Sequence, residues 1–210
     1  YLGHSSFKLK GKTASVVTDP YSNDTGLKYP KVEADIVTIS HEHQDHNNAK
    51  GVSGEPKIIN GAGEYEIGGV SIFGVPSYHD EKGGEERGRN TIYVINVDGV
   101  NVCHLGDLGH KLTSTELDEI GTVDVLLIPV GGVYTIDAAG AVEVVSQLEP
   151  SIVIPMHYKT AGLKYELGSV EDFLKEIGTE PLKDVKFTVT PMTLPETMQV
   201  VVLESKSGSN

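Results

Sequence analysis

Residues 40–48 have the side chains best suited to chemistry. Their sequence, Ser-His-Glu-His-Gln-Asp-His-Asn-Asn, contains three of the 8 histidines of the chain. Because residues two apart near a strand end project the same way, His41 and His43 are predicted to bind one metal ion. Asp45 and His46 continue around the turn towards a second ion. A polar surface loop with a chance cluster of histidines is the alternative, but imidazoles and carboxylates at this density favour metal binding.

The pattern His-x-His-x-Asp-His resembles the signature of the metallo-β-lactamase superfamily, and the resemblance extends in order along nearly the whole chain. Residues 16–20, Val-Val-Thr-Asp-Pro, are similar to the first motif of that family, which implies that Asp19 orients the metal-binding loop. Three later residues stand where the family has ligands, each after a predicted strand: His79, Asp107 and His157.

This resemblance implies a dinuclear metal site. The implied ligands are His41, His43 and His79 for one ion, Asp45, His46 and His157 for the other, and Asp107 as the bridge. Such ligands suit zinc, which is the expected metal, and the same set accepts manganese or iron. Two dications that share a hydroxide make it a nucleophile at neutral pH. Asp45, Asp107 and His4 are the residues expected to take part in catalysis.

Three further motifs are similar to the compact branch of the superfamily that includes ascorbate-6-phosphate lactonase. They lie at residues 3–7, 128–132 and 154–158. His4 belongs to the first of them. Its role stays open between a structural histidine and a part of the site, as proton donor, additional ligand or support for a ligand.

Other polar residues near the implied ligands are assigned to support or to substrate binding. His104 and His110 flank Asp107 and are expected to support it by hydrogen bonds. Residues 80–89 follow His79 and form either a solvated loop or a flap over the site. The residues expected to contact substrate are basic or aromatic: Arg87, Arg89, Tyr134, Lys159 and Lys164.

The composition limits the class of protein. A chain of 210 residues, 38% of them hydrophobic, predicts one domain, here residues 1–204 with a polar tail at 205–210. A net charge of -13 argues against nucleic acid as a partner, although two metal ions would make the site itself attractive to anions. Cys103 is the only cysteine, which excludes an intrachain disulfide and suits a cytoplasmic location. No apolar run is long enough for a membrane span, and a homo-oligomer stays open.

Apolar patterns predict the elements that must position these residues. The predicted strands are 7–9, 14–18, 34–40, 57–60, 70–75, 91–97, 100–105, 123–130, 151–156, 185–190 and 198–203. Asp98-Gly99 predicts a tight antiparallel hairpin. Thr113, Asp137 and Ser169 are expected to cap three helices that end near residues 120, 148 and 177. We therefore predict an α/β (α+β) fold of the αββα type, two packed sheets with helices on their outer faces.

The predicted activity is metal-dependent hydrolysis of an ester, lactone or phosphoester in a small anionic molecule. A mononuclear-iron redox enzyme, like the persulfide dioxygenases of the same superfamily, is one alternative. His43 stands where the di-iron flavoproteins of the superfamily have glutamate, which argues against a di-iron redox site. A metal-binding protein without catalysis is the other alternative, and the complete ligand set argues against it.

Overall fold

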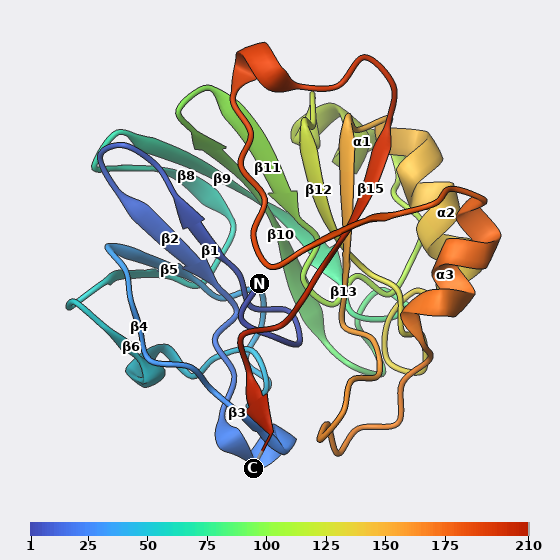
Figure 1. Cartoon of the computed structure of the whole chain (residues 1–210), viewed down its shortest axis with the longest axis horizontal. Helices are drawn as coiled ribbons and strands as arrows, with labels where there is room; N and C mark the ends of the chain where they lie inside the picture. The colour runs from blue at the N-terminus through green and yellow to red at the C-terminus, as the bar shows by residue number, and fades with distance from the viewer. Residues whose placement is uncertain (210) are drawn as a thin grey trace.

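Two β-sheets packed face to face form the centre of the molecule, as the computed structural model of residues 1–209 shows (Figure 1). The smaller sheet has the order β1-β2-β5-β7. Its strands are β1 (Lys8–Lys10), β2 (Ser15–Thr18), β5 (Ile36–Thr38) and β7 (Lys57–Ile59). Strand β1 is antiparallel to β2, whereas β2, β5 and β7 are parallel.

The larger sheet has eight strands in the order β14-β15-β13-β12-β11-β10-β9-β8. They are β8 (Gly63–Ile67), β9 (Val70–Tyr78), β10 (Arg89–Val97), β11 (Val100–His104), β12 (Val125–Pro129), β13 (Ile152–Met156), β14 (Leu182–Asp184) and β15 (Gln199–Leu203). From β8 to β11 neighbours are antiparallel, and from β11 onwards they are parallel. Strands β9, β11 and β13 therefore point in the same direction, and their carboxyl ends lie at one edge of the sheet.

The predicted hairpin and helix caps are confirmed. Strands β10 and β11 pair around Asp98 and Gly99, which both have positive φ, as a tight turn requires. The caps Thr113, Asp137 and Ser169 each accept a hydrogen bond from a backbone N–H in the first turn of their helix. These helices are α1 (Ser114–Ile120), α2 (Ala138–Leu148) and α3 (Val170–Ile177).

The fold class is confirmed, and the two outer layers differ in their construction. All three α-helices cover the outer face of the larger sheet, on the right of Figure 1, where they bury a large apolar cluster. Short pieces cover the smaller sheet: β4 (Val32–Glu33), β6 (Val52–Ser53) and the 3-10 turn Ala49–Gly51. A further 3-10 turn, Asn23–Thr25, contacts β3 (Leu27–Lys28) instead. Within residues 1–209 no α-helix lies over that face and none is long and apolar enough to cross a membrane.

Several segments differ from the sequence prediction. Residues 185–190 form no strand: the backbone leaves the sheet after β14, while the partly buried side chains of Phe187 and Val189 still pack against the core. The alternating pattern there thus reflects packing alone. Strands β3, β4, β6, β8 and β14 were not predicted, although in β8 Tyr65 and Ile67 alternate with glutamates. In the predicted polar tail, β16 (Gly208–Ser209) pairs with β3 (Leu27–Lys28).

Candidate metal centre

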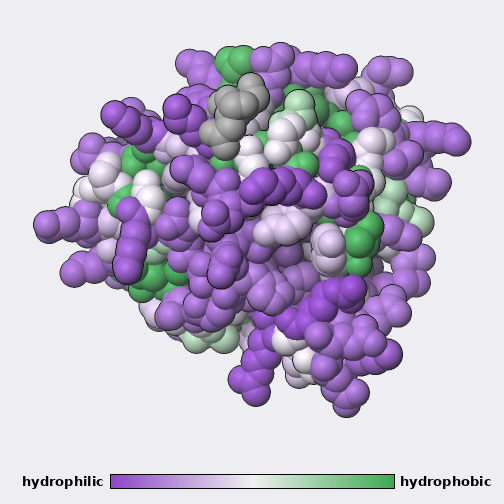
Figure 2. Space-filling model, turned by 90° about the horizontal axis from the view of Figure 1, so that it is seen from below, coloured by the Kyte–Doolittle hydropathy of each residue, from purple (hydrophilic) through white to green (hydrophobic). Residues whose placement is uncertain are grey.

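The implied ligands come together because the strands that precede them end at the same edge. The His-rich loop follows β5, whereas His79, Asp107 and His157 follow β9, β11 and β13 of the facing sheet. In Figure 1 this edge lies at the bottom, where the loop after β13 descends. Figure 2 views the molecule from that side and shows a mostly hydrophilic surface with scattered hydrophobic residues.

Asp19 organises the His-rich loop from beneath. Its buried carboxylate accepts hydrogen bonds from the backbone N–H and hydroxyl of Ser40 and from Nδ1–H of His46, which lies 2.9 Å away. The Ser40 hydroxyl in turn accepts from Nδ1–H of His41. Burial raises the pKa of Asp19, but His104 and His46 outweigh it and hold that pKa below its ordinary value. An ionised Asp19 therefore fixes Nδ1–H on both histidines and leaves their Nε2 lone pairs for other partners.

The candidate ligand atoms fall into two groups, each with its atoms within 4.8 Å of one another. One group contains His41, His43 and His79. The other contains His4, Asp45, His46 and His157, so it has one histidine more than the set that the sequence resemblance implies. A third, overlapping group joins Asp19 to His41 and His46, but the hydrogen bonds of Asp19 already use its oxygens.

Asp107 lies between the two groups. The distances from its Oδ2 atom to histidine Nε2 atoms are 3.2 Å for His46, 3.2 Å for His79, 3.3 Å for His157 and 3.8 Å for His41. Gly106 makes this approach feasible, because its φ is +56° and a Cβ there would lie 2.3 Å from Asn90 Oδ1. Asn90 itself accepts from the backbone N–H of Asp107.

These residues fit a cation. The Nε2 atoms of His41 and His46 are buried and without a hydrogen-bond partner among the described residues, yet both face a carboxylate. A lone pair that faces a carboxylate is repelled by it, and a metal ion bound between the two would turn this repulsion into attraction. Two ligands of a tetrahedral ion about 2.0–2.1 Å from each are about 3.3 Å apart, close to the distances around Asp107. Burial lowers the pKa of His46, but Asp107 and two further carboxylates raise it well above its ordinary value, so this place favours positive charge.

His104 and His110 do not make the predicted hydrogen bonds to Asp107. Strand β11 turns His104 towards the segment that precedes β1, where Nε2–H donates to the Ser5 carbonyl over 2.8 Å. Its Nδ1 accepts from the N–H of Gly106, so His104 supports the turn that carries Asp107 rather than the carboxylate. His110 points the other way, towards helix α1, and accepts from the backbone N–H of Tyr78.

A cavity of about 300 Å³ opens onto the ligands. Its wall consists of His43, Asp45, His79, Arg87, Asp107, Tyr134, His157 and Tyr165. Arg87 donates to the Val133 carbonyl, and its guanidinium lies 5.9 Å from the centre of the Tyr134 ring. Arg87 and Tyr134 thus lie where a substrate contact was predicted. Tyr165 was not among the predicted substrate residues, although it follows His157 in the same loop.

The other three predicted substrate residues are not part of this wall. Lys159 directs its ammonium into its own loop, where it donates to the carbonyls of Leu163 and Tyr165 over 3.2 and 2.7 Å. Arg89 and Lys164 are exposed outside the cavity. Their sequence positions predicted a place in the site, but none of the three side chains lines the cavity.

The loop after His79 is folded around one carboxylate. Asp80 accepts from the backbone N–H groups of residues 82, 84, 86 and 87, at 2.8, 2.9, 3.0 and 2.7 Å. Burial raises the pKa of Asp80, but these donors outweigh it and lower that pKa to about 2. The loop therefore has a defined fold that brings Arg87 to the cavity.

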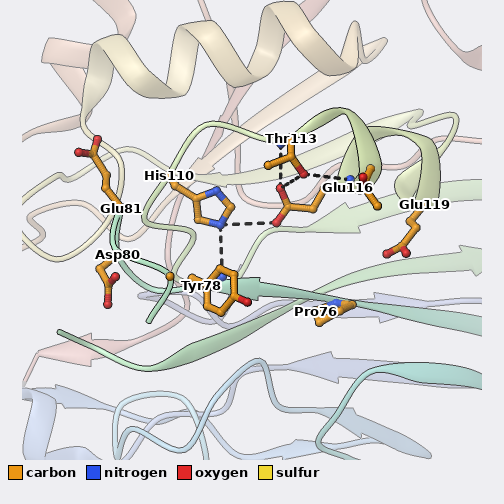
Figure 3. A pocket seen from close by; sticks show the side chains of 10 residues that line it. Pro76, Tyr78, Asp80, Glu81, His110, Thr113, Glu116 and Glu119 are labelled. Atoms are coloured by element: carbon orange, nitrogen blue, oxygen red, sulfur yellow. Dashed lines mark hydrogen bonds and ion pairs between the residues drawn. The ribbon is translucent and has the colours of Figure 1, made fainter. Parts of the chain in front are cut away.

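A second cavity, of about 320 Å³, lies on the helix side of the same segment. Figure 3 shows Tyr78, His110 and Glu116 in its wall with their side chains close together, and Asp80, Glu81 and Glu119 around it. His110 and Glu116 already have partners there, since Glu116 also completes the cap of helix α1. None of the candidate metal groups within residues 1–209 lies in this cavity.

The chain is similar to known proteins over nearly its whole length. The model of the family described as "Beta-lactamase superfamily domain" matches residues 1–157. A UPF0173 metal-dependent hydrolase of Archaeoglobus fulgidus is 30% identical over 221 residues, which cover 90% of this chain and 94% of that protein. The chain therefore belongs to the metallo-β-lactamase superfamily.

Solved structures agree with this assignment. A candidate Zn-dependent hydrolase of the metallo-β-lactamase superfamily from Thermotoga maritima superposes with a TM-score of 0.82 and 40% identity, over 98% of this chain and 97% of that chain. Igni18, a metallo hydrolase from Ignicoccus hospitalis, has a TM-score of 0.66 and 21% identity over 99% and 95% of the two chains. The second similarity concerns the fold alone.

Proposed function

We propose that this protein, a metal-dependent hydrolase of the metallo-β-lactamase superfamily, holds two divalent metal ions and cleaves an ester, lactone or phosphoester in a small anionic molecule. The observation that carries the proposal is the position of Asp107 Oδ2 between two groups of histidines. The proposed ligands are His41, His43 and His79 for the first ion, Asp45, His46 and His157 for the second, and Asp107 as the bridge.

The donor set suits zinc, with manganese or iron as alternatives. When bound, two such dications supply an activated water and polarise the bond to be cleaved. Asp19 keeps the Nε2 atom of His46 directed at them by a direct hydrogen bond, and that of His41 through the Ser40 hydroxyl. The remaining residues of the cavity wall bind and orient the substrate.

An anionic small molecule suits this cavity. Its volume of about 300 Å³ is at the lower end of ordinary ligand sites. Arg87 is the only lysine or arginine among the described residues of its wall, so we assign it the substrate's anionic group. Tyr134 and Tyr165 offer hydroxyl groups and flat apolar faces for the rest of the molecule.

We also propose a cytoplasmic location and no nucleic-acid partner. Cys103 is buried and unpaired, which suits a reducing compartment. The charge of -13 would oppose binding to a phosphate backbone.

A mononuclear-iron redox enzyme remains the rival proposal. One iron ion at the first group would leave the Nε2 of His46 facing two carboxylates without a cation, which is the reason we favour two ions.

Hydrolysis by metal-loaded protein tests the function directly. We expect protein loaded with Zn²⁺ or Mn²⁺ to cleave at least one compound in a panel of lactones, phosphodiesters and carboxylic esters, and chelator-treated protein to lose that activity. Turnover should return when the metal is restored. No cleavage across the panel, together with one iron per chain and oxidation of a persulfide, would favour the rival.

A further inference from the structure

His4 lies beside the second ligand group, far from it in sequence. Its Nε2 atom is 3.1 Å from Asp45 Oδ2, and its ring centre is 4.3 Å from that of His157 and 5.1 Å from that of His46. The candidate ligand atoms of these four residues all lie within 4.8 Å of one another. The imidazole therefore faces the place that the second ion would occupy.

His4 reaches this position with a strained backbone conformation. His4 has a φ of 54°, which a non-glycine residue rarely adopts, and such strain gathers at functional sites. It follows Gly3, where a Cβ would lie 2.8 Å from the Tyr21 hydroxyl. The carbonyl of His4 accepts from the backbone N–H of His157 over 2.9 Å, so the tight turn is bound directly to a proposed ligand.

The surroundings of the ring argue against a purely structural histidine. A structural histidine in a core normally has partners for both ring nitrogens. His4 is buried, its Nδ1 has no hydrogen-bond partner among the described residues, and its Nε2 contacts only the proposed ligand Asp45.

We propose that His4 is an additional ligand of the second metal ion, an inference that rests on the dinuclear site proposed above. The second ion then has His4, Asp45, His46 and His157 besides the bridge, whereas the first has His41, His43 and His79. The second group is also more enclosed, because Asp45 is half-buried while His43 in the first group is exposed. The second site is thus the tighter one and fills first, and the first site is the one that exchanges its metal.

Metal titration tests this without any substrate. Metal-free protein would be titrated with Zn²⁺ by calorimetry in competition with a chelator of known affinity. We expect two binding steps for the unaltered protein. His4→Ala should weaken the tighter step by more than about 100-fold, above the roughly 10–100-fold typical of residues that only hydrogen-bond to a ligand. The weaker step should change little. His110→Ala, a histidine outside the site, is the matched control and should keep both steps.

His4→Gln separates ligation from support. Glutamine retains an N–H that donates to Asp45 but removes the imidazole, so a supporting role predicts near-normal affinity and ligation predicts a loss like that of His4→Ala. Near-normal Zn²⁺ affinity in His4→Gln would overturn the inference while leaving the dinuclear site intact. If the unaltered protein bound no metal at all, the proposed function would be refuted as well.

A measurement on the unaltered protein covers the case in which these variants fail to fold. With ¹¹³Cd as the metal and ¹⁵N-labelled histidines, a metal ligand shows scalar coupling between its nitrogen and cadmium. We expect this coupling at Nε2 of His4 as well as at His46 and His157. Coupling at the latter two without any at His4 would overturn the inference.

Discussion

At the scale of single residues, one buried carboxylate determines how two histidines present themselves to the metal site. Asp19 accepts directly from Nδ1–H of His46 and, through the Ser40 hydroxyl, orders Nδ1–H of His41. Both Nε2 atoms then face Asp107, an arrangement that is unfavourable without a cation and favourable with one. The orientation of these two imidazoles is therefore set by the protein itself, without a bound metal ion.

The central place of Asp107 leads to a prediction about metal content. Asp107→Ala removes the carboxylate nearest to both histidine groups, so we expect it to weaken both metal sites and to reduce turnover by orders of magnitude. His110→Ala alters a histidine only three residues away that does not contact Asp107, and it should leave the metal content near normal. Elemental analysis after dialysis compares the two. Two firmly bound metal ions in Asp107→Ala would contradict the ligand assignment.

Substrate charge gives a second prediction at this scale. If Arg87 binds the anionic group of the substrate, Arg87→Ala should raise KM for an anionic ester by about 10- to 150-fold, since a hydrogen bond to a charged group contributes about 1.5–3 kcal/mol. KM for a neutral analogue of similar size should change much less. Lys164→Ala removes a charge outside the cavity and serves as the control. Equal losses on both substrates would mean that Arg87 does not bind the anionic group.

At the scale of elements, two of the loops that follow proposed ligands are each held in shape by one charged side chain. In both loops this residue lies within two positions of the ligand in the sequence. Asp80, next to His79, accepts hydrogen bonds from four backbone N–H groups. Lys159, two residues after His157, donates hydrogen bonds to two backbone carbonyls. The first loop brings Arg87 to the cavity and the second brings Tyr165. Both charged side chains therefore stabilise the loops that form the cavity wall and do not contact the cavity themselves.

The Asp80 loop offers a prediction that does not depend on the substrate. Asp80→Ala leaves four backbone N–H groups without their acceptor, so amide hydrogen exchange at residues 82, 84, 86 and 87 should accelerate by at least about tenfold. Amides in helix α3, which lies elsewhere, provide the internal control. Unchanged exchange in the loop would show that Asp80 does not determine its fold.

At the scale of the whole molecule, local signals predicted most of the elements and the ligand-bearing loops. Helix caps such as Thr113 and the turn at Asp98 and Gly99 work through contacts within a few residues, which the sequence records directly. Side-chain directions in loops follow no period, so the inward turn of Lys159 and the place of Tyr165 were not predicted. The prediction of a strand at 185–190 was wrong for a related reason. Alternating apolar residues can pack against the core without the hydrogen bonds of a β-sheet.

The two facing sheets also explain why the site needs the complete fold. The His-rich loop leaves the smaller sheet, whereas His79, Asp107 and His157 leave the larger one, so neither sheet alone holds a full ligand set. Apolar clusters shared by the two sheets, such as Val16 and Ile36 with Ile72 and Ile95, set their separation. The metal ions would then join the two sheets at their common edge.

Anomalous diffraction from crystals grown with Zn²⁺ tests this account most directly. We predict two zinc peaks about 3.5–4 Å apart. One should lie beside His41, His43 and His79 and the other beside Asp45, His46 and His157, with Asp107 between them. A single peak, or zinc bound away from Asp107, would contradict the dinuclear centre.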